Sequence, residues 1–252
     1  MSGHSHWAGI KHKKALVDNK RGKLWSKLSK AIIIAAKLGG GDPAANIRLR
    51  TAILDAKAGS MPKDTIERAI KRGTGELDGG NIEEILYEGY GVGGVAVLCE
   101  IMTDNRNRTA PEIRKIFDVY NGKLGGTNCV AWMFERKGLF VIPAANVTEE
   151  QLMEVALEAG ADDVKQVVAN FEVACDPEKY AAVGEALEQA GLAVSAKMVT
   201  RIPKTTVDLP LEDARKVIKL LEALDDHDDV QNVSSNFSVS DEVMAQIEAA
   251  NA

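Results

Sequence analysis

The chain has 252 residues, a formal net charge of −6, 45% apolar and 27% charged residues. This length allows one to three domains with ordinary hydrophobic cores, so the composition excludes a disordered or fibrous protein. No apolar run approaches the roughly 20 residues of a membrane span, and the polar, basic first residues do not resemble a secretory signal. The three cysteines are far apart, which argues against a disulfide scaffold and a structural zinc site. We therefore predict a soluble cytoplasmic protein.

The net charge conceals a strong asymmetry along the chain. Residues 1–72 contain 16 Lys and Arg against 5 Asp and Glu, a net charge of +11. The other 180 residues contain 15 Lys and Arg against 32 Asp and Glu, a net charge of −17. Such an asymmetry favours contact with a polyanion or an acidic partner. A basic face that is only solvated is the alternative interpretation.

The first predicted helix covers residues 15–38, where apolar residues recur at spacings of three and four. Lysines form a second stripe at helical spacing, and a basic cluster precedes the helix. These cations would neutralise phosphates, while the early tryptophan could stack on a base or sugar. The predicted nucleic-acid-binding residues here are Trp7, Lys11, His12, Lys13, Lys14, Lys20, Arg21, Lys23, Lys27 and Lys30.

Two shorter helices are predicted to complete a small basic bundle. One begins with Asp42 as N-cap and Pro43 in the first turn, and ends near Gly59. The other begins around Pro62 and ends at Gly73. The polar, glycine-rich residues 73–81 then read as a linker. We expect this bundle to form a domain over residues 1–78.

A change of pattern from residue 94 indicates an α+β region. A buried strand is predicted over residues 95–102, a helix capped by Thr109 with Glu112, and a strand over 128–134. Near the end of the chain, residues 205–209, 211–224 and 230–239 are predicted to form strand, helix and strand. Each piece resembles half of one domain, which suggests a domain that is split by an insertion.

The intervening residues predict a complete βαββαβ unit, the ferredoxin-like order. Its first helix has a capping box formed by Thr148 and Gln151. The predicted fold class is thus α+β and multidomain: an N-terminal three-helix basic bundle followed by two ferredoxin-like α+β domains, one inserted in the other. The expected limits are 79–134 plus 205–245 for the split domain and 135–204 for the inserted domain.

The motifs associated with catalysis or cofactors are weak. Residues 89–94 match G-x-G-x-x-G but precede a strand, whereas a dinucleotide site needs the motif to open a helix. His4, His6 and His12 have no nearby carboxylate or thiol at ligand spacing, and residues 225–229 (DDHDD) lack the glycine and closing glutamate of a calcium loop. We predict a polar turn at 225–229, no metal, no cofactor and no enzymatic activity.

The loop over residues 103–109 is a further candidate site. Arg106 and Arg108 lie between a strand end and a helix start, with hydrogen-bonding neighbours. Guanidinium groups near a helix N-terminus can grip a phosphate. An Asx-type turn with two solvated arginines explains the same residues equally well, so both interpretations stay open.

Distinctive motifs are spread along nearly the whole chain. They are Gly3–Ala15 (GHSHWAGIKHKKA), Asp18–Lys23 (DNKRGK), Ala35–Pro43 (AAKLGGGDP), Met61–Ile70 (MPKDTIERAI), Tyr87–Gly91, Thr103–Thr109, Ala156–Ala161 and Asp228–Val233. Together they resemble the motifs of the YebC family. The departures are His6, where the family usually has Lys, Gly9, where it often has Asn, and a varied glycine-rich turn at 125–129.

The resemblance implies three domains and no catalytic activity. Family members are described as DNA-binding transcriptional regulators, and others, including mitochondrial relatives, are linked to translation on the ribosome. We therefore expect a nucleic-acid-binding regulator of gene expression, in the first place a DNA-binding transcriptional regulator. The alternatives are a ribosome-associated translation factor that binds ribosomal or transfer RNA, and a protein-interaction scaffold. The sequence shows no recognition helix with Arg, Asn and Gln placed for base edges, which keeps the RNA alternative open.

Overall fold

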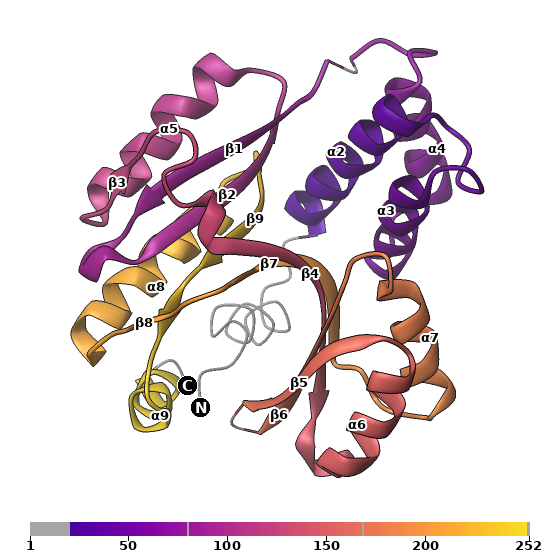
Figure 1. Ribbon diagram of the computed structural model, residues 1–252. Helices are drawn as coiled ribbons and strands as arrows, with labels where there is room; N and C mark the ends of the chain where they lie inside the picture. The colour runs from indigo at the N-terminus through magenta and orange to yellow at the C-terminus, as the bar shows by residue number, and fades with distance from the viewer. Residues whose placement is uncertain (1–20, 80, 168, 251–252) are drawn as a thin grey trace.

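The computed structural model describes residues 21–79, 81–167 and 169–250. It contains a group of helices beside two four-stranded sheets, each with its own helices (Figure 1). The predicted fold class, α+β and multidomain, is confirmed. Within the described residues, no helix is long and apolar enough to cross a membrane.

The basic N-terminal region folds as three packed helices. They are α2 (Arg21–Gly39), α3 (Ile47–Ala58) and α4 (Lys63–Gly73). Ile32, Leu49 and Ile66 contribute to their shared core, which also takes in Met102 from the neighbouring sheet. Helix α4 ends very close to α2, because a Cβ on Gly73 would lie 2.5 Å from the carbonyl oxygen of Ile33.

The predicted start of the second helix is wrong. Helix α3 begins after Asn46, whose Oδ1 accepts a hydrogen bond from the backbone N–H of Leu49 at 3.0 Å. The Nδ2 group of Asn46 donates to the carbonyls of Ala35 and Gly40, both at 2.8 Å. The buried side chain of Asn46 thus forms hydrogen bonds at the C-terminal end of α2 and at the N-terminal end of α3. It therefore caps α3 in place of the exposed Asp42.

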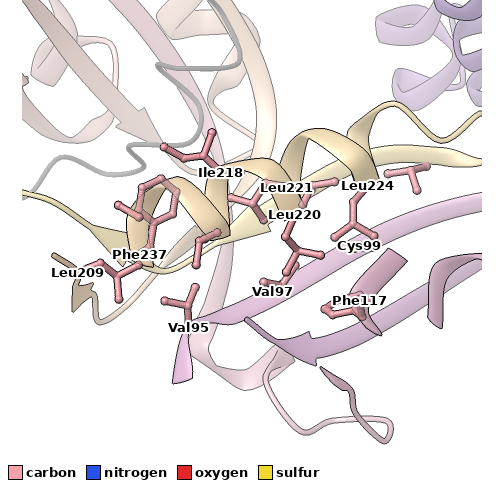
Figure 2. Packing of buried hydrophobic residues seen from close by; sticks show 14 of the residues in the cluster. Val95, Val97, Cys99, Phe117, Leu209, Ile218, Leu220, Leu221, Leu224 and Phe237 are labelled. Carbon is pink, nitrogen blue, oxygen red and sulfur yellow. The ribbon is translucent and has the colours of Figure 1, made fainter. Parts of the chain in front are cut away.

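The split region has a four-stranded sheet in the order β3-β1-β2-β9 and a parallel pair of β8 with β10. Helices α5 and α8 and strand β2 share one core with α9, and Figure 2 shows Phe117, Leu220 and Val97 from this cluster. The elements are β1 (Glu83–Tyr90), β2 (Ala96–Thr103), α5 (Arg106–Val119), β3 (Lys123–Leu124), β8 (Val207–Asp208), α8 (Leu211–Asp225), β9 (Val230–Ser235), β10 (Phe237–Ser238) and α9 (Asp241–Ala250).

Strand β2 is buried on both faces. Its side chains point alternately into two different hydrophobic cores. Val97, Cys99 and Ile101 face helices α5 and α8. Ala96 and Leu98 face the opposite way, where Val130 from the loop before β4 (Phe134–Pro143) and Phe134, the first residue of that strand, cover them. Successive side chains of a strand point to opposite faces, so a continuous apolar run fits this position.

The inserted region consists of β4 (Phe134–Pro143), α6 (Glu149–Glu158), β5 (Ala161–Val167), β6 (Asn170–Cys175), α7 (Tyr180–Gln189) and β7 (Ala196–Pro203). Its antiparallel sheet has the order β5-β6-β4-β7, which is the ferredoxin-like arrangement. The predicted capping box of Thr148 and Gln151 is confirmed. Figure 1 shows β4 and β7 running side by side from the split region into this sheet.

Three local predictions in the split region are wrong or incomplete. The predicted strand at 128–134 is instead a loop with a short 3₁₀ turn (Ala131–Met133). Helix α5 begins at Arg106 with Asn105 as N-cap, not with Thr109. Strand β1 was not predicted from the sequence, because its glutamates and glycine weaken the apolar alternation.

Candidate nucleic-acid interface

The lysine stripe of α2 lies against the acidic turn Asp225–Asp229, which connects α8 to β9 and is called the acidic turn below. Lys23 Nζ donates to the carbonyl of Asp226 at 2.8 Å, and Lys27 Nζ donates to the carbonyl of Asp225 at 2.6 Å. Lys30 Nζ donates to the carbonyl of Asp228 at 3.0 Å. These three lysines are about one helical turn apart on α2. Each of them therefore donates to a main-chain oxygen of the acidic turn.

Carboxylates of the acidic turn add ion pairs to the same lysines. Lys30 Nζ lies 2.6 Å from Oδ1 of Asp229. Longer pairs join Lys23 to Asp228 at 3.5 Å and Lys27 to Asp225 at 3.8 Å. The stripe thus faces inward, onto a surface of opposite charge, and connects the basic helices to the split region.

Asp229 is the centre of this contact, and its side chain is only 4% exposed. Its Oδ2 lies 2.9 Å from Nη2 of Arg108 and 2.7 Å from the hydroxyl of Thr109. The hydroxyl of Thr103 is also close, at 3.1 Å. Burial alone would raise the pKa of Asp229, but the hydrogen bonds from Lys30, Thr109 and Arg108 outweigh it and hold that pKa well below the usual carboxyl range.

The two arginines of the 103–109 loop have different surroundings. Arg108 forms ion pairs with Asp229 and, at 3.1 Å, with Asp104, so its guanidinium is engaged within the protein. Arg106 is exposed in the first turn of α5. The Asx-type turn is present, because Asn105 Oδ1 accepts a hydrogen bond from the backbone N–H of Arg108 at 3.1 Å. The geometry therefore leaves Arg106, more than Arg108, open to an external phosphate.

His227 stiffens the acidic turn. Its Nδ1 accepts a hydrogen bond from the backbone N–H of Asp229 at 3.1 Å, and its Nε2 lies 3.0 Å from Oε2 of Glu112. Because Nδ1 accepts, the ring proton on Nε2 points to Glu112. A groove of about 850 Å³ runs beside this contact, and residues of both charge signs line it. The predicted polar turn at 225–229 is present. Its contact with the lysine stripe was not predicted from the sequence.

Other cations of the basic helices point away from the protein. Arg50 and Lys57 on α3, and Lys71 and Arg72 on α4, are exposed. Within the part of the chain that the structure describes, none of these four has an ion-pair partner. Lysine and arginine without internal carboxylates are the groups that can neutralise phosphates with the least competition. None of these four residues is among the nucleic-acid-binding residues that were predicted from the sequence.

Several predicted contact residues lie outside the described residues, namely Trp7, Lys11, His12, Lys13, Lys14 and Lys20. Arg21 begins α2, but its side chain is not described. The structure therefore brings together Lys23, Lys27 and Lys30 with Arg108 at the acidic turn, whereas Arg106 forms no ion pair there among the described residues.

Comparisons with known proteins place the chain among close relatives. The model of the TACO1/YebC protein N-terminal domain matches residues 5–76, and that of the TACO1/YebC second and third domain matches residues 82–237. A probable transcriptional regulatory protein of Rhodopirellula baltica is 57% identical over 98% of this chain and all of its own length. A protein of the same description from Geobacter sulfurreducens is 54% identical over the same shares.

A solved structure is similar along almost the whole chain. It is the crystal structure of a conserved hypothetical protein from Aquifex aeolicus, with a TM-score of 0.84 and 50% identity. The alignment covers 95% of this chain and 99% of the other. The arrangement of helices and sheets described above is therefore shared with an experimentally determined relative.

Proposed function

This chain belongs to the TACO1/YebC family, and on that premise we propose that it regulates gene expression by binding nucleic acid through its basic N-terminal region. Relatives named as probable transcriptional regulatory proteins support the regulatory role. The leading form of the proposal is a DNA-binding transcriptional regulator. No catalytic step is proposed, and burial raises the pKa of the Cys99 thiol and, to about 11, that of Cys175, so neither thiol is primed as a nucleophile.

The observation that carries the proposal is the set of outward-facing cations on α3 and α4. Arg50, Lys57, Lys71 and Arg72 are exposed, and they belong to a segment of net charge +11. Contacts of this type supply affinity and salt dependence, because each neutralised phosphate releases counterions. The basic cluster at Lys11, Lys13 and Lys14, which lies outside the described residues, belongs to the same basic segment of the chain.

The lysines of α2 have a different place in the proposal. Lys23, Lys27 and Lys30 already donate to the acidic turn, so a phosphate would have to compete with it. We propose that they mainly fix the basic helices on the split region. Their predicted contact with phosphate stays a prediction, as does that of Arg106 and Arg108.

A salt titration with matched variants tests the proposal. Binding of the full chain to duplex DNA is measured by fluorescence anisotropy over a series of salt concentrations. We expect the triple variant Arg50→Ala, Lys71→Ala, Arg72→Ala to flatten the slope of log K against log salt by up to about 3. The matched control removes Lys165, Lys216 and Lys219, three exposed lysines of the acidic regions, and should leave the slope unchanged.

Two results would overturn this assignment. Absence of binding to any nucleic acid at low salt would leave a protein-interaction scaffold as the better account. An unchanged slope in the triple variant, with loss of binding in Lys13→Ala, Lys14→Ala, would move the interface to the first residues of the chain.

RNA on the ribosome is the second candidate target. Helices α2, α3 and α4 contain no Asn or Gln, the side chains that read adenine edges in the major groove, which favours backbone contacts over sequence recognition. Co-sedimentation with ribosomes, without measurable preference for any DNA duplex, would support this candidate and exclude the transcriptional form.

A further inference from the structure

A buried carboxylate holds the surface loop over residues 125–132, called the Glu88 loop below. The side chain of Glu88 accepts hydrogen bonds from the backbone N–H groups of Asn128, Val130 and Ala131 at 2.6, 2.8 and 2.7 Å. The residue is only 2% exposed. Burial of a carboxylate costs free energy unless hydrogen bonds compensate it, and here three amides of one loop do so. The loop is therefore held in one shape.

Two aromatic side chains are anchored on this loop with much of their surface in solvent. Trp132 is 68% exposed, and its Nε1 donates to the carbonyl of Cys129 at 3.2 Å. Tyr90 is 39% exposed, and its hydroxyl donates to the same carbonyl at 3.1 Å. A shared acceptor brings the polar edges of the two rings together. Their polar atoms are satisfied within the protein, which leaves apolar ring surface for a partner.

Packing in the hydrophobic core does not explain the position of Trp132. Val130 and Phe134, on either side of it in the chain, are buried against Ala96 and Leu98 of the sheet. Trp132 lies between these two buried residues but outside the cluster. An exposed tryptophan on a rigid loop is a common sign of a binding surface.

Lys123, a positively charged residue, lies next to Tyr90 in the sheet. Strand β3 pairs with β1 so that Lys123 is directly opposite Tyr90, and directly opposite residues of an antiparallel pair share a face. Lys123 is exposed and, among the described residues, has no carboxylate partner. The carboxylate of Glu88, two residues before Tyr90 on β1, is engaged by backbone N–H groups of the Glu88 loop.

We propose that Tyr90, Lys123 and Trp132 form a second nucleic-acid site, which stacks an unpaired base on the aromatic rings and binds the adjacent phosphate with the ammonium group. Aromatic side chains combined with a neighbouring cation are the means by which proteins hold single strands without sequence preference. The unpaired cation favours a polyanion over an apolar peptide segment. The site lies in the split region, apart from the basic helices, and does not depend on the function proposed for them.

Single-stranded RNA of about ten nucleotides is a suitable probe, because such strands fill one site of this kind. Anisotropy gives the affinity of the full chain at low salt, and tryptophan emission reports stacking directly. We expect Trp132→Ala to weaken single-strand binding by roughly 5- to 100-fold and Trp132→Phe to weaken it less. The quenching of emission by RNA should be strongly reduced in Trp132→Phe.

Lys123→Ala tests the phosphate contact. It should flatten the salt slope for single strands by about 0.7, whereas the matched control Lys219→Ala, at an exposed lysine of α8, should not change the slope. Tyr90→Phe removes the hydroxyl but keeps the ring, so it separates loss of the loop contact from loss of stacking.

The outcomes distinguish this site from the basic helices. Wild-type single-strand affinity in both Trp132→Ala and Lys123→Ala would refute the site, whatever the α3 and α4 variants do. Quenching of Trp132 by a proline-rich peptide but not by RNA would also refute it and indicate a protein partner. Weakened single-strand binding in Trp132→Ala, with no effect of the Arg50, Lys71 and Arg72 changes on the salt slope of duplex binding, would support this site and contradict the proposed interface.

Discussion

Two of the buried carboxylates among the described residues, Glu88 and Asp229, are stabilised in different ways. Asp229 is surrounded by side chains from separate segments, including Lys30 from α2 and Arg108 from α5. Glu88 is instead surrounded by backbone N–H groups of a single loop. The first arrangement fastens distant parts of the chain to one another through charges, and the second shapes one loop. The difference predicts different responses to mutation, acid and salt.

The largest expected effect is that of Glu88→Ala. The change leaves three loop amides without their acceptor, at least one of them buried, and we expect a loss of about 4 kcal/mol in the free energy of unfolding. Urea unfolding at neutral pH measures it. The control is Glu83→Ala, at an exposed glutamate of the same strand, which should change stability by less than about 0.5 kcal/mol. Equal effects in both variants would contradict the role given to Glu88.

Asp229→Asn should have the next largest effect, about 3 kcal/mol, because Lys30 and Arg108 lose their shared counter-charge. The control is Asp228→Asn, since the side chain of Asp228 is 68% exposed and forms only a long ion pair. Urea unfolding distinguishes the two variants. Similar stabilities would show that the Asp229 network contributes little.

Acid should reduce the difference in stability between the wild type and Asp229→Asn. The pKa of Asp229 is lower in the folded protein than in the unfolded chain, where it is about 3.9. The stability that this carboxylate contributes is therefore complete above pH 4 to 5 and is lost as the pH falls through the lowered value. Unfolding curves of both proteins between pH 7 and pH 2 measure this. A difference that stays constant over the whole range would contradict the ion-pair account.

The smallest expected effects on stability are those of two lysines of the stripe, which differ in burial. Lys30 is 17% exposed at the side chain and meets Asp229, so Lys30→Ala should cost about 2 kcal/mol. Lys23 is 45% exposed, and its loss should cost at most about 0.5 kcal/mol, less at high salt. Thermal unfolding at low and high salt compares them. A larger effect for Lys23→Ala than for Lys30→Ala would contradict the order of burial.

Local signals in the sequence were sufficient where the structure is also local. The capping box of Thr148 and Gln151 depends on residues three apart, and the apolar run predicted as a strand over 95–102 forms β2 at Ala96–Thr103. The cap at Asn46 was missed because its other hydrogen bonds reach back to Ala35, at the end of the preceding helix.

The candidate sites show the same difference between local patterns, which the sequence reveals, and long-range contacts, which it does not. The lysine stripe was visible as a pattern, but its partner lies about 200 residues further along the chain, so the sequence could not say which way the stripe faces. The exposed Trp132 stands in a segment predicted as a strand, and only the backbone contacts of Glu88 reveal that the segment is a loop.

The lysines of α2 donate largely to main-chain carbonyls of the acidic turn rather than to its carboxylates. A carbonyl oxygen is present whatever residue occupies the position, so the aspartates at 225, 226 and 228 can be replaced during evolution while this docking persists. Charge-reversal swaps between α2 and these three positions should therefore fail to restore binding of one segment to the other. Correlated substitutions between homologues should likewise identify only the pair of Lys30 with Asp229, even though the contact extends over the whole first half of the helix.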